Sequence, residues 1–146
     1  MQGQLLIVFI LVVSALGLTS FILPLLLRTP SPFVVVMSGS MEPSLRPGDL
    51  LVVEGYRSRG PDVGDVVVYR SRRYRRVIVH RVVSVDESRG DVTLFTKGDA
   101  VEYADREPVE MGDVLGSVRW RVGWLGFPSY FLWRALGRLE GESNPF

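Results

Sequence analysis

The sequence predicts a mainly β domain carried on an N-terminal transmembrane helix and followed by a short C-terminal helix. Residues 1–27 contain no Asp, Glu, Lys or Arg, so every formally charged side chain of the 146-residue chain lies from Arg28 onward. The apolar runs after Arg28 are short, rich in valine and bounded by turn residues, as is typical of strands. From Trp120 onward the chain becomes a mixture of aromatic residues, glycine and arginine.

The first element is the uncharged run Leu5–Leu27, "LLIVFILVVSALGLTSFILPLLL". As a helix it would span about 34 Å, against roughly 30 Å for the hydrocarbon core of a bilayer. A cleaved signal peptide would have a basic start and a shorter apolar stretch, whereas "MQGQ" is uncharged and the run continues past the small pair Ala15 and Gly17. We therefore expect a retained anchor.

Pro24 falls in the last turn of this helix and is expected to kink or end it. The orientation is poorly specified, because no basic residue precedes the helix while Arg28 and further arginines follow it. Counted by arginine alone, the following domain would lie in the cytoplasm.

The β domain is expected to contain strands at 33–37, 50–54, 66–69, 77–85, 92–96 and 114–118. Along the strand at 77–85, "VIVHRVVSV", alternation of side chains places Ile78, His80, Val82 and Ser84 on one face.

The C-terminal segment, "WRVGWLGFPSYFLWRALGRLE", is too short in its apolar part to cross a bilayer. A helix at the membrane interface and a helix packed on the β domain both fit its composition. The chain thus divides into an anchor at 1–28, a β-rich domain at 29–119 and an aromatic, arginine-rich segment at 120–146.

The candidate chemistry lies between two predicted strands, where Ser38 and Ser40 flank a glycine in "MSGSMEPSLRPGD". A serine nucleophile needs a base within hydrogen-bond reach and a third group that orients the base. His80 is the single histidine, and "TKGDAVEYAD" supplies Asp99 and Asp105. An ordinary turn and a histidine packed in the core remain alternatives from these residues alone.

Composition narrows the other classes of site. Without cysteine there are no disulfides and no thiolate catalysis or thiolate metal sites, and one histidine leaves only carboxylates to complete a metal site. A hard cation bound by Asp99, Glu102 and Asp105 stays an alternative, but these residues lack the spacing of a calcium loop, so we expect no metal or cofactor. Sixteen of the 17 basic residues are arginine, which cannot act as a base, so His80, Lys97 and the carboxylates are the candidate bases. The 17 basic and 16 acidic residues nearly balance, so the net charge gives no reason to expect nucleic acid as a partner. The arginine-rich segment "RSRRYRR" at 70–76 suits a solvated hairpin or a contact with lipid headgroups.

In these motifs the chain resembles type I signal peptidases of the Ser-His-Asp type, in particular the archaeal and endoplasmic-reticulum branch. "SGSMEPSL" resembles the nucleophile box, "PGDLLVV" the strand after it, "GDVVVY" the next box, "VIVHRVV" the base box and "TKGDAVEYAD" the acid box. The likeness runs from the anchor to about residue 118. Ala100 and Val101 stand where this branch often has two asparagines, which leaves the division of roles between Asp99 and Asp105 open.

The resemblance implies an antiparallel, partly barrel-like β domain and a membrane-bound serine endopeptidase that removes signal peptides from secreted preproteins after small residues. Ser40 would be the nucleophile, His80 the general base and Asp105 the residue that orients it. Asp99 would be a supporting acid, while the Ser38 hydroxyl and the Ser40 backbone N–H would form the oxyanion hole.

The resemblance also implies a single-pass protein of the cell membrane with its N-terminus inside and its catalytic domain outside the cytoplasm, against the arginine count. Its expected partners are preprotein signal peptides, the lipid bilayer and the protein-translocation machinery. Two other functions stay open: a serine–lysine peptidase that uses Lys97, and a membrane-anchored β domain that binds a partner without catalysis.

Overall fold

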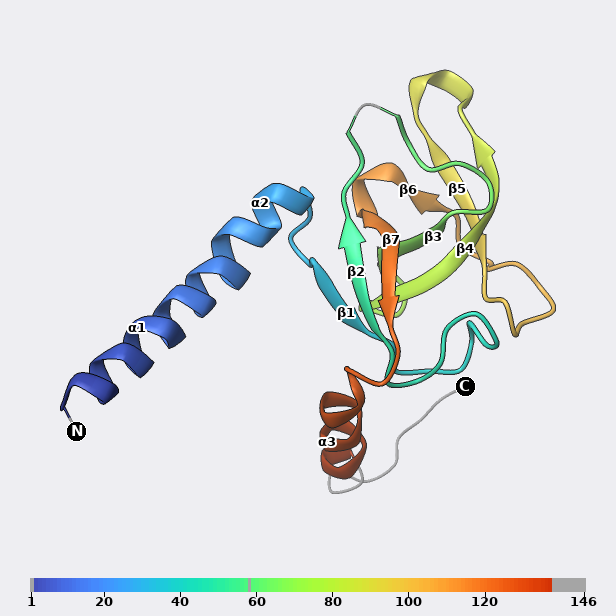
Figure 1. Ribbon diagram of the computed structural model, residues 1–146. Coiled ribbons are helices and arrows are strands. Elements are labelled where there is room, and N and C mark those ends of the chain that lie inside the picture. The colour runs from blue at the N-terminus through green and yellow to red at the C-terminus, as the bar shows by residue number, and fades with distance from the viewer. Residues whose placement is uncertain (1, 58, 138–146) are drawn as a thin grey trace.

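The computed structural model describes residues 2–57 and 59–137. It shows a curled β-sheet, preceded in the chain by a long helix and followed by a short one (Figure 1). The expected fold class, mainly antiparallel β with an N-terminal apolar helix and a short C-terminal helix, is confirmed.

A continuous apolar helix occupies Gln2–Leu27 and is long enough to cross a membrane. It consists of α1 (Gln2–Gly17), a π-helical turn (Leu18–Ile22) and α2 (Leu23–Leu27). Pro24, which has no backbone N–H, directly follows the first residue after the π-helical turn. The wider π-helical turn therefore accommodates the proline. The helix ends at Leu27, and the next residue, Arg28, has a left-handed backbone (φ 53°).

Within the described residues, seven strands form one sheet in the spatial order β1-β2-β7-β3-β4-β5-β6, and all neighbouring pairs are antiparallel. The strands are β1 (Phe33–Val35), β2 (Leu50–Glu54), β3 (Val66–Ser71), β4 (Arg76–Asp86), β5 (Thr93–Lys97), β6 (Val109–Glu110) and β7 (Val114–Val122). Short 3₁₀ turns occupy Ser88–Gly90 and Met111–Asp113.

Several strand ends differ from the prediction by one or two residues, and two strands, β6 and β7, differ more. β6 was not predicted, because a strand of two residues shows no alternation in the sequence. β7 continues to Val122, past the change in composition at Trp120, so the strand crosses the expected boundary between residues 119 and 120. The division into three parts therefore stays a prediction.

The alternation along β4 changes phase after Val82. His80 and Val82 are buried, but Ser84 is exposed and Val85 packs against the core instead. The pairing of β4 with β5 shifts between Val82 and Ser84, so Val83 is an extra residue in β4. A bulge of this kind exchanges the inward and outward positions beyond it. The expectation that Ser84 shares the inward face of His80 was wrong for this reason.

The end of the N-terminal helix is joined to β2 by close backbone contacts. The N–H of Gly55 donates to the carbonyl of Leu27 (2.7 Å), and the N–H of Val53 donates to the carbonyl of Pro32 (2.9 Å). A Cβ at Gly55 would lie 1.9 Å from the carbonyl oxygen of Arg28, so only glycine permits this approach. The helix end and the sheet are thereby held together.

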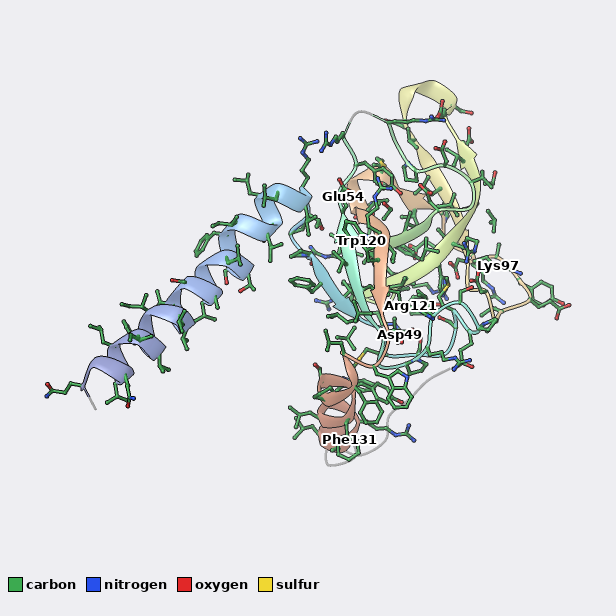
Figure 2. All side chains as sticks on the ribbon, in the orientation of Figure 1. Asp49, Glu54, Lys97, Trp120, Arg121 and Phe131 are labelled. Carbon is green, nitrogen blue, oxygen red and sulfur yellow. The ribbon has the colours of Figure 1, made fainter. Side chains whose placement is uncertain are left out.

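α3 (Phe127–Gly137) follows β7, and β1 lies between α2 and α3 (Figure 1). Its start packs on the segment before β2, where the N–H of Gly126 donates to the carbonyl of Gly48 (3.1 Å). The rest of its apolar surface is uncovered, as Figure 2 shows for Phe131. The exposed apolar side chains of this region are Trp120, Val122, Trp124, Leu125, Phe127, Phe131, Leu132, Trp133 and Leu136.

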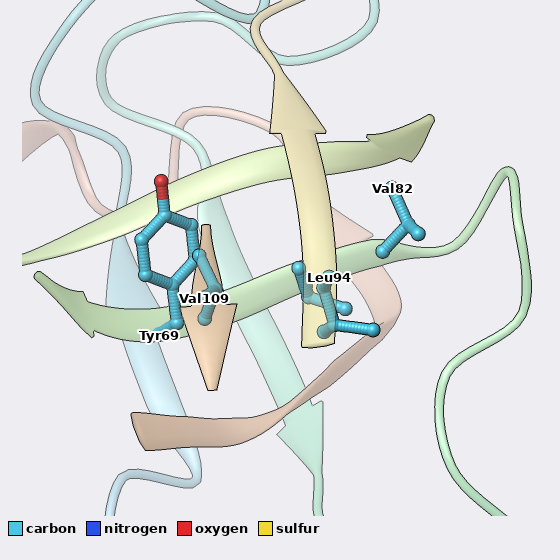
Figure 3. Close-up of a cluster of buried hydrophobic side chains, with 5 residues drawn as sticks. Tyr69, Val82, Leu94 and Val109 are labelled. Carbon is cyan, nitrogen blue, oxygen red and sulfur yellow. The ribbon is translucent and has the colours of Figure 1, made fainter. Parts of the chain in front are cut away.

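The sheet carries a buried cluster on each face. The first contains Val67, Tyr69, Val82, Leu94 and Val109 (Figure 3). The second contains Val36, Met41, Leu45 and Leu51, with Val66 and Val79 packed against it. Because alternate residues of a strand face opposite sides, β4 directs His80 to the face of the first cluster and Arg81 to the face of the second.

Candidate active site

Ser38 and Ser40 lie in the segment between β1 and β2, at the start of a tight turn. The N–H of Glu42 donates to the carbonyl of Gly39 (3.0 Å), and the N–H of Leu45 donates to the carbonyl of Met41 (2.9 Å). Met41 is only 1% exposed and belongs with Leu45 to the second cluster, whereas Ser40 is partly exposed. The turn is thus held by Met41 in the core while the neighbouring serine faces outward.

Two charged residues brace the same segment. Asp49 is almost completely buried, and its carboxylate accepts a hydrogen bond from the backbone N–H of Arg46 (2.9 Å). Arg121 on β7 lies 3.6 Å from this carboxylate and donates to the carbonyl of Ser44 (2.9 Å). Figure 2 shows Asp49 and Arg121 close together at the lower ends of β2 and β7. This contact ties the turn to the centre of the sheet.

His80 stands between Ser40 and Asp105. Its Nε2 lies 3.2 Å from Oγ of Ser40, and its Nδ1 lies 2.6 Å from Oδ2 of Asp105. Because an ionised carboxylate only accepts hydrogen bonds, Nδ1 carries the proton and Nε2 is free to accept the hydroxyl hydrogen of Ser40. Oγ of Ser38 lies 3.3 Å from Oγ of Ser40. Ser40, His80 and Asp105, which are far apart in the sequence, are therefore neighbours in one chain of hydrogen bonds.

The Asp105 carboxylate is held by several donors. Its Oδ2 accepts hydrogen bonds from the Thr96 hydroxyl (2.6 Å) and the Tyr69 hydroxyl (3.2 Å) as well as from His80. Burial acts to raise the pKa of Asp105, but the hydrogen bonds from His80, Thr96 and Tyr69 outweigh it and hold the pKa below its usual range. Burial raises the pKa of Tyr69, so its phenol stays protonated and continues to donate. Asp105 is thus a fixed anion behind the His80 ring.

Asp99 is paired with Arg81. Nε of Arg81 donates to Oδ1 of Asp99 (2.8 Å) and Nη2 donates to Oδ2 (2.7 Å), a two-point contact. These hydrogen bonds lower the pKa of Asp99 against the opposing effect of burial. Arg81 also donates to the carbonyl of Gly64 (2.9 Å), and its Nη2 lies 3.4 Å from the Ser44 hydroxyl. Arg81 and Asp99 therefore connect three loops around Ser40.

The turn that contains Asp99 rests on the backbone of Ser40. The N–H of Ala100 donates to the Ser40 carbonyl (2.9 Å), and the N–H of Val101 donates to the Gly98 carbonyl (3.1 Å). A Cβ at Gly98 would lie 2.6 Å from the Ser40 carbonyl oxygen and 3.1 Å from Nε2 of His80. A side chain at this position would push Ser40 and His80 apart, so Gly98 belongs to the site.

Lys97, the alternative base, ends β5 opposite Arg81 in the sheet register. Figure 2 shows it on the side of the domain away from α1. Within the described part of the chain, the hydrogen bonds of the Ser40 hydroxyl go to His80 and Ser38. The geometry therefore favours His80 over Lys97 as the group that receives the serine proton.

A hollow of about 300 Å³ lies on the other side of Asp105, between the 69–74 and 105–110 segments. Tyr69 and Asp105 contribute to its lining, but Ser40 does not. Ser40 therefore lies outside this hollow.

Residues 3–107 match the family described as "Signal peptidase, peptidase S26", which is well over half of the chain. The chain belongs to this signal peptidase family. The resemblance predicted from the sequence motifs is thereby confirmed, and the S26 match includes Ser40, His80, Asp99 and Asp105. Their catalytic roles stay predictions.

Curated S26 relatives include signal peptidase complex catalytic subunits. The subunit SEC11C of Homo sapiens is 39% identical over 104 residues, which cover 66% of this chain and 54% of the relative. The subunit SEC11 of Verticillium alfalfae is 38% identical over 112 residues, which cover 71% of this chain and 65% of the relative. The chain spans about half the length of the SEC11C relatives.

Several residues of the site were not predicted, among them Tyr69, Thr96, Arg81 and Arg121. Tyr69 and Thr96 stood inside quoted motifs of the signal peptidase pattern, but a buried hydroxyl carries no chemical signal of its own in a sequence. Arg81 follows the single histidine directly, and that adjacency was the available signal. Arg121 comes from a segment that was expected to be a helix, either at the membrane interface or packed on the β domain, and only the length of β7 brings it to the site.

Proposed function

We propose that the chain is a membrane-bound serine endopeptidase that removes N-terminal signal peptides from secreted preproteins, cutting after small residues. One observation carries this proposal: the hydrogen bonds from Ser40 to His80 (3.2 Å) and from His80 to Asp105 (2.6 Å) in a chain of the S26 family. The arrangement has the three parts that serine nucleophiles need, namely a hydroxyl, a base and a group that orients the base.

Nε2 of His80 takes the hydroxyl proton as Oγ of Ser40 attacks the carbonyl carbon of the scissile bond. The Asp105 carboxylate stabilises the imidazolium that results. His80 then gives this proton to the leaving amine, the C–N bond breaks, and the signal peptide stays bound to Ser40 as an ester. Water, deprotonated by His80, hydrolyses the ester and restores the Ser40 hydroxyl.

The Ser38 hydroxyl and the backbone N–H of Ser40 stabilise the negative charge that develops on the carbonyl oxygen. The proximity of the two hydroxyls, 3.3 Å between their Oγ atoms, supports this role for Ser38. Loss of one such donor typically lowers the rate by about 10²- to 10³-fold. Ser38→Ala is therefore expected to be impaired but active.

The substrate lies extended along the outer edge of β1 (Phe33–Val35). β1 ends the sheet in the strand order and pairs with β2, and among the described residues no strand pairs with its other edge, which could accept an added strand. The valine side chains of this strand would form shallow apolar pockets, which suit small residues before the cut. β1 leads directly into the turn that holds Ser40, so a strand paired there reaches the nucleophile.

The helix Gln2–Leu27 crosses the membrane once, with the catalytic domain outside the cytoplasm, and α3 lies at the membrane interface. The helix has the required length and apolar composition. The aromatic side chains of α3 are exposed, and α3 flanks β1 on the side opposite α2 (Figure 1). Aromatic residues mixed with arginine suit the boundary between lipid and water. The substrate edge of β1 would then face the bilayer surface.

The expected partners are signal peptides, the lipid bilayer and other membrane proteins of secretion. The relatives SEC11C and SEC11 are named catalytic subunits of a signal peptidase complex. Their names support a proposal that this chain also works next to the translocation machinery and within an assembly of membrane proteins.

The test is cleavage of a purified preprotein by the full chain in liposomes. Ser40→Ala is expected to abolish cleavage. His80→Ala is expected to reduce cleavage strongly, because it removes the proposed general base. Lys97→Ala, assayed beside them, is expected to retain activity. Cleavage by Ser40→Ala would refute the proposal, whereas loss of activity in Lys97→Ala alone would assign the base to Lys97.

A further inference from the structure

We propose that Val101 determines which residue the enzyme accepts immediately after the cut. This inference rests on the proposed peptidase function. A residue that contacts the substrate next to the cut must be accessible to it and must lie near the reacting groups, and it can be varied only if the chemistry does not need it. Val101 meets these three conditions.

Val101 lies next to His80 across Gly98. A Cβ built on Gly98 would be 3.1 Å from Nε2 of His80 and also 3.1 Å from Cγ2 of Val101. The isopropyl group of Val101 and the catalytic face of the imidazole therefore border the same small space. The valine side chain is not packed in the core, because Val101 is 43% exposed.

The turn that carries Val101 is fixed on the nucleophile segment by its backbone. The N–H of Ala100 donates to the Ser40 carbonyl (2.9 Å), and the N–H of Val101 donates to the Gly98 carbonyl (3.1 Å). Neither hydrogen bond uses the Val101 side chain, so substitutions there leave the turn intact. The nearby charge of Asp99 is already paired with Arg81.

The chemistry identifies the part of the substrate that meets Val101. Nε2 of His80 must come within hydrogen-bond reach, about 3 Å, of the leaving nitrogen in order to protonate it. That nitrogen belongs to the first residue of the released mature protein. The scissile carbonyl carbon carries both the oxygen and the leaving nitrogen. Ser38 is proposed to contact the oxygen, so its side of the carbon differs from the side of the leaving nitrogen. Val101 therefore faces the first mature residue and not the residue before the cut.

An isopropyl group at this place favours a small or apolar side chain and disfavours a charged one, which would lose hydration against it. The contact is half-exposed, so we expect a preference of about three- to tenfold, below that of an enclosed apolar pocket. The inferred substrate class is thus a preprotein whose first mature residue is uncharged.

The experiment compares four versions of one preprotein, with Leu, Gln, Glu or Lys directly after the cut, cleaved by the full chain in liposomes. Wild type is expected to have a higher kcat/KM for Leu than for Glu or Lys. Val101→Lys should raise the Glu-to-Lys ratio of kcat/KM by about two- to fivefold, and Val101→Glu should lower it by a similar factor. Both shifts should shrink at high salt.

Two controls separate a contact from a general effect. Tyr103→Lys places the same charge on an exposed residue of the same loop and should leave the ratio unchanged. Val101→Thr keeps the shape of valine and should narrow the Leu-to-Gln ratio without any change of charge. An unchanged Glu-to-Lys ratio in both charged variants would overturn the inference. If wild type cleaves none of the four preproteins, the proposed function fails, and the inference fails with it.

Discussion

Nδ1 of His80 and the Thr96 hydroxyl both lie 2.6 Å from the same oxygen of Asp105, Oδ2. The Tyr69 hydroxyl, 3.2 Å away, is a third donor to this oxygen. Because three donors from three strands converge on one atom, the carboxylate cannot turn without breaking several hydrogen bonds. The orientation of the His80 ring is therefore determined by the sheet behind it.

Asp105→Asn should lower kcat by about 10⁴-fold, the loss typical of a triad whose histidine is held in the wrong tautomer. An asparagine amide can donate to Nδ1, which moves the imidazole proton to Nε2 and leaves no acceptor for Ser40. The measurement is kcat for preprotein cleavage in liposomes. Asp99→Asn is the matched comparison and should lose less, because the Asp99 carboxylate is bound to Arg81. A larger loss in Asp99→Asn would reverse the two roles.

Thr96→Val should destabilise the domain by about 1–3 kcal/mol, because it removes a buried donor from Asp105 at nearly constant volume. With one donor gone, the pKa of Asp105 rises toward its usual range. The stability that depends on the ionised carboxylate is then lost at a higher pH as the solution is acidified. Thermal unfolding of the full chain in detergent at several pH values measures this shift. Thr96→Ser keeps the hydroxyl and should behave as wild type. If Thr96→Val loses stability at the same pH as wild type, Thr96 does not stabilise the ionised Asp105.

Gly98→Ala should reduce kcat by about 10²-fold with a smaller effect on stability. Its Cβ would lie 2.6 Å from the Ser40 carbonyl oxygen, so the turn must move away from Ser40. A displacement near 1 Å is enough for a loss of this size. Gly112→Ala is the control, because a Cβ at Gly112 meets nothing within 4 Å. Activity of Gly98→Ala close to that of Gly112→Ala would show that the turn does not position Ser40.

The ion pair of Asp99 with Arg81 should make stability depend on pH in the acid range. The pKa of Asp99 is lowered in the folded state, so its contribution is fully present above the unfolded value of about 3.9 and is lost as the pH falls through the lower folded value. The difference in Tm between wild type and Asp99→Asn should therefore be constant near neutral pH and shrink below about pH 4. Asp62→Asn removes an exposed pair with Arg59 and should change Tm little at any pH. A difference that persists undiminished below pH 3 would contradict this assignment.

Tryptophan fluorescence should report contact of the C-terminal segment with lipid. The three tryptophans of the chain are Trp120, Trp124 and Trp133, and all are exposed. Trp133 lies on α3 and Trp124 just before it, whereas Trp120 lies on β7. In vesicles made with brominated acyl chains, their emission should be quenched relative to ordinary vesicles, because interfacial aromatic rings reach the acyl boundary. Unquenched emission typical of water would show that α3 stays clear of the bilayer.

Most of the fold could be predicted because its strands are short valine-rich runs between turn residues. The exceptions have physical reasons. β6 is too short to show alternation, and β7 continues into residues whose aromatic side chains are exposed. The bulge at Val83 has no glycine or proline to mark it, so the sequence alone predicts an unbroken alternation through Ser84.

The candidate site could be predicted as residue types but not as contacts. Ser40 and His80 stood out because one is in a hydroxyl-rich turn and the other is the single histidine. Asp99 and Asp105 share one loop, and only the path of that loop directs the first to Arg81 and the second to His80. No periodic pattern describes such a path. The same holds for Val101, whose position depends on a turn seated against Ser40.

The neighbouring residues His80 and Arg81 point to opposite faces of β4. The pairing register that β4 adopts during folding therefore decides which of the two lies beside Ser40. If β4 paired with β3 one residue out of step, arginine would take the place of histidine beside Ser40. Arginine cannot accept a proton, so such a molecule would be inert and not merely slow. Activity is therefore all-or-none with respect to strand pairing. Titration of Ser40 with an acylating inhibitor would count the correctly assembled sheets in a preparation.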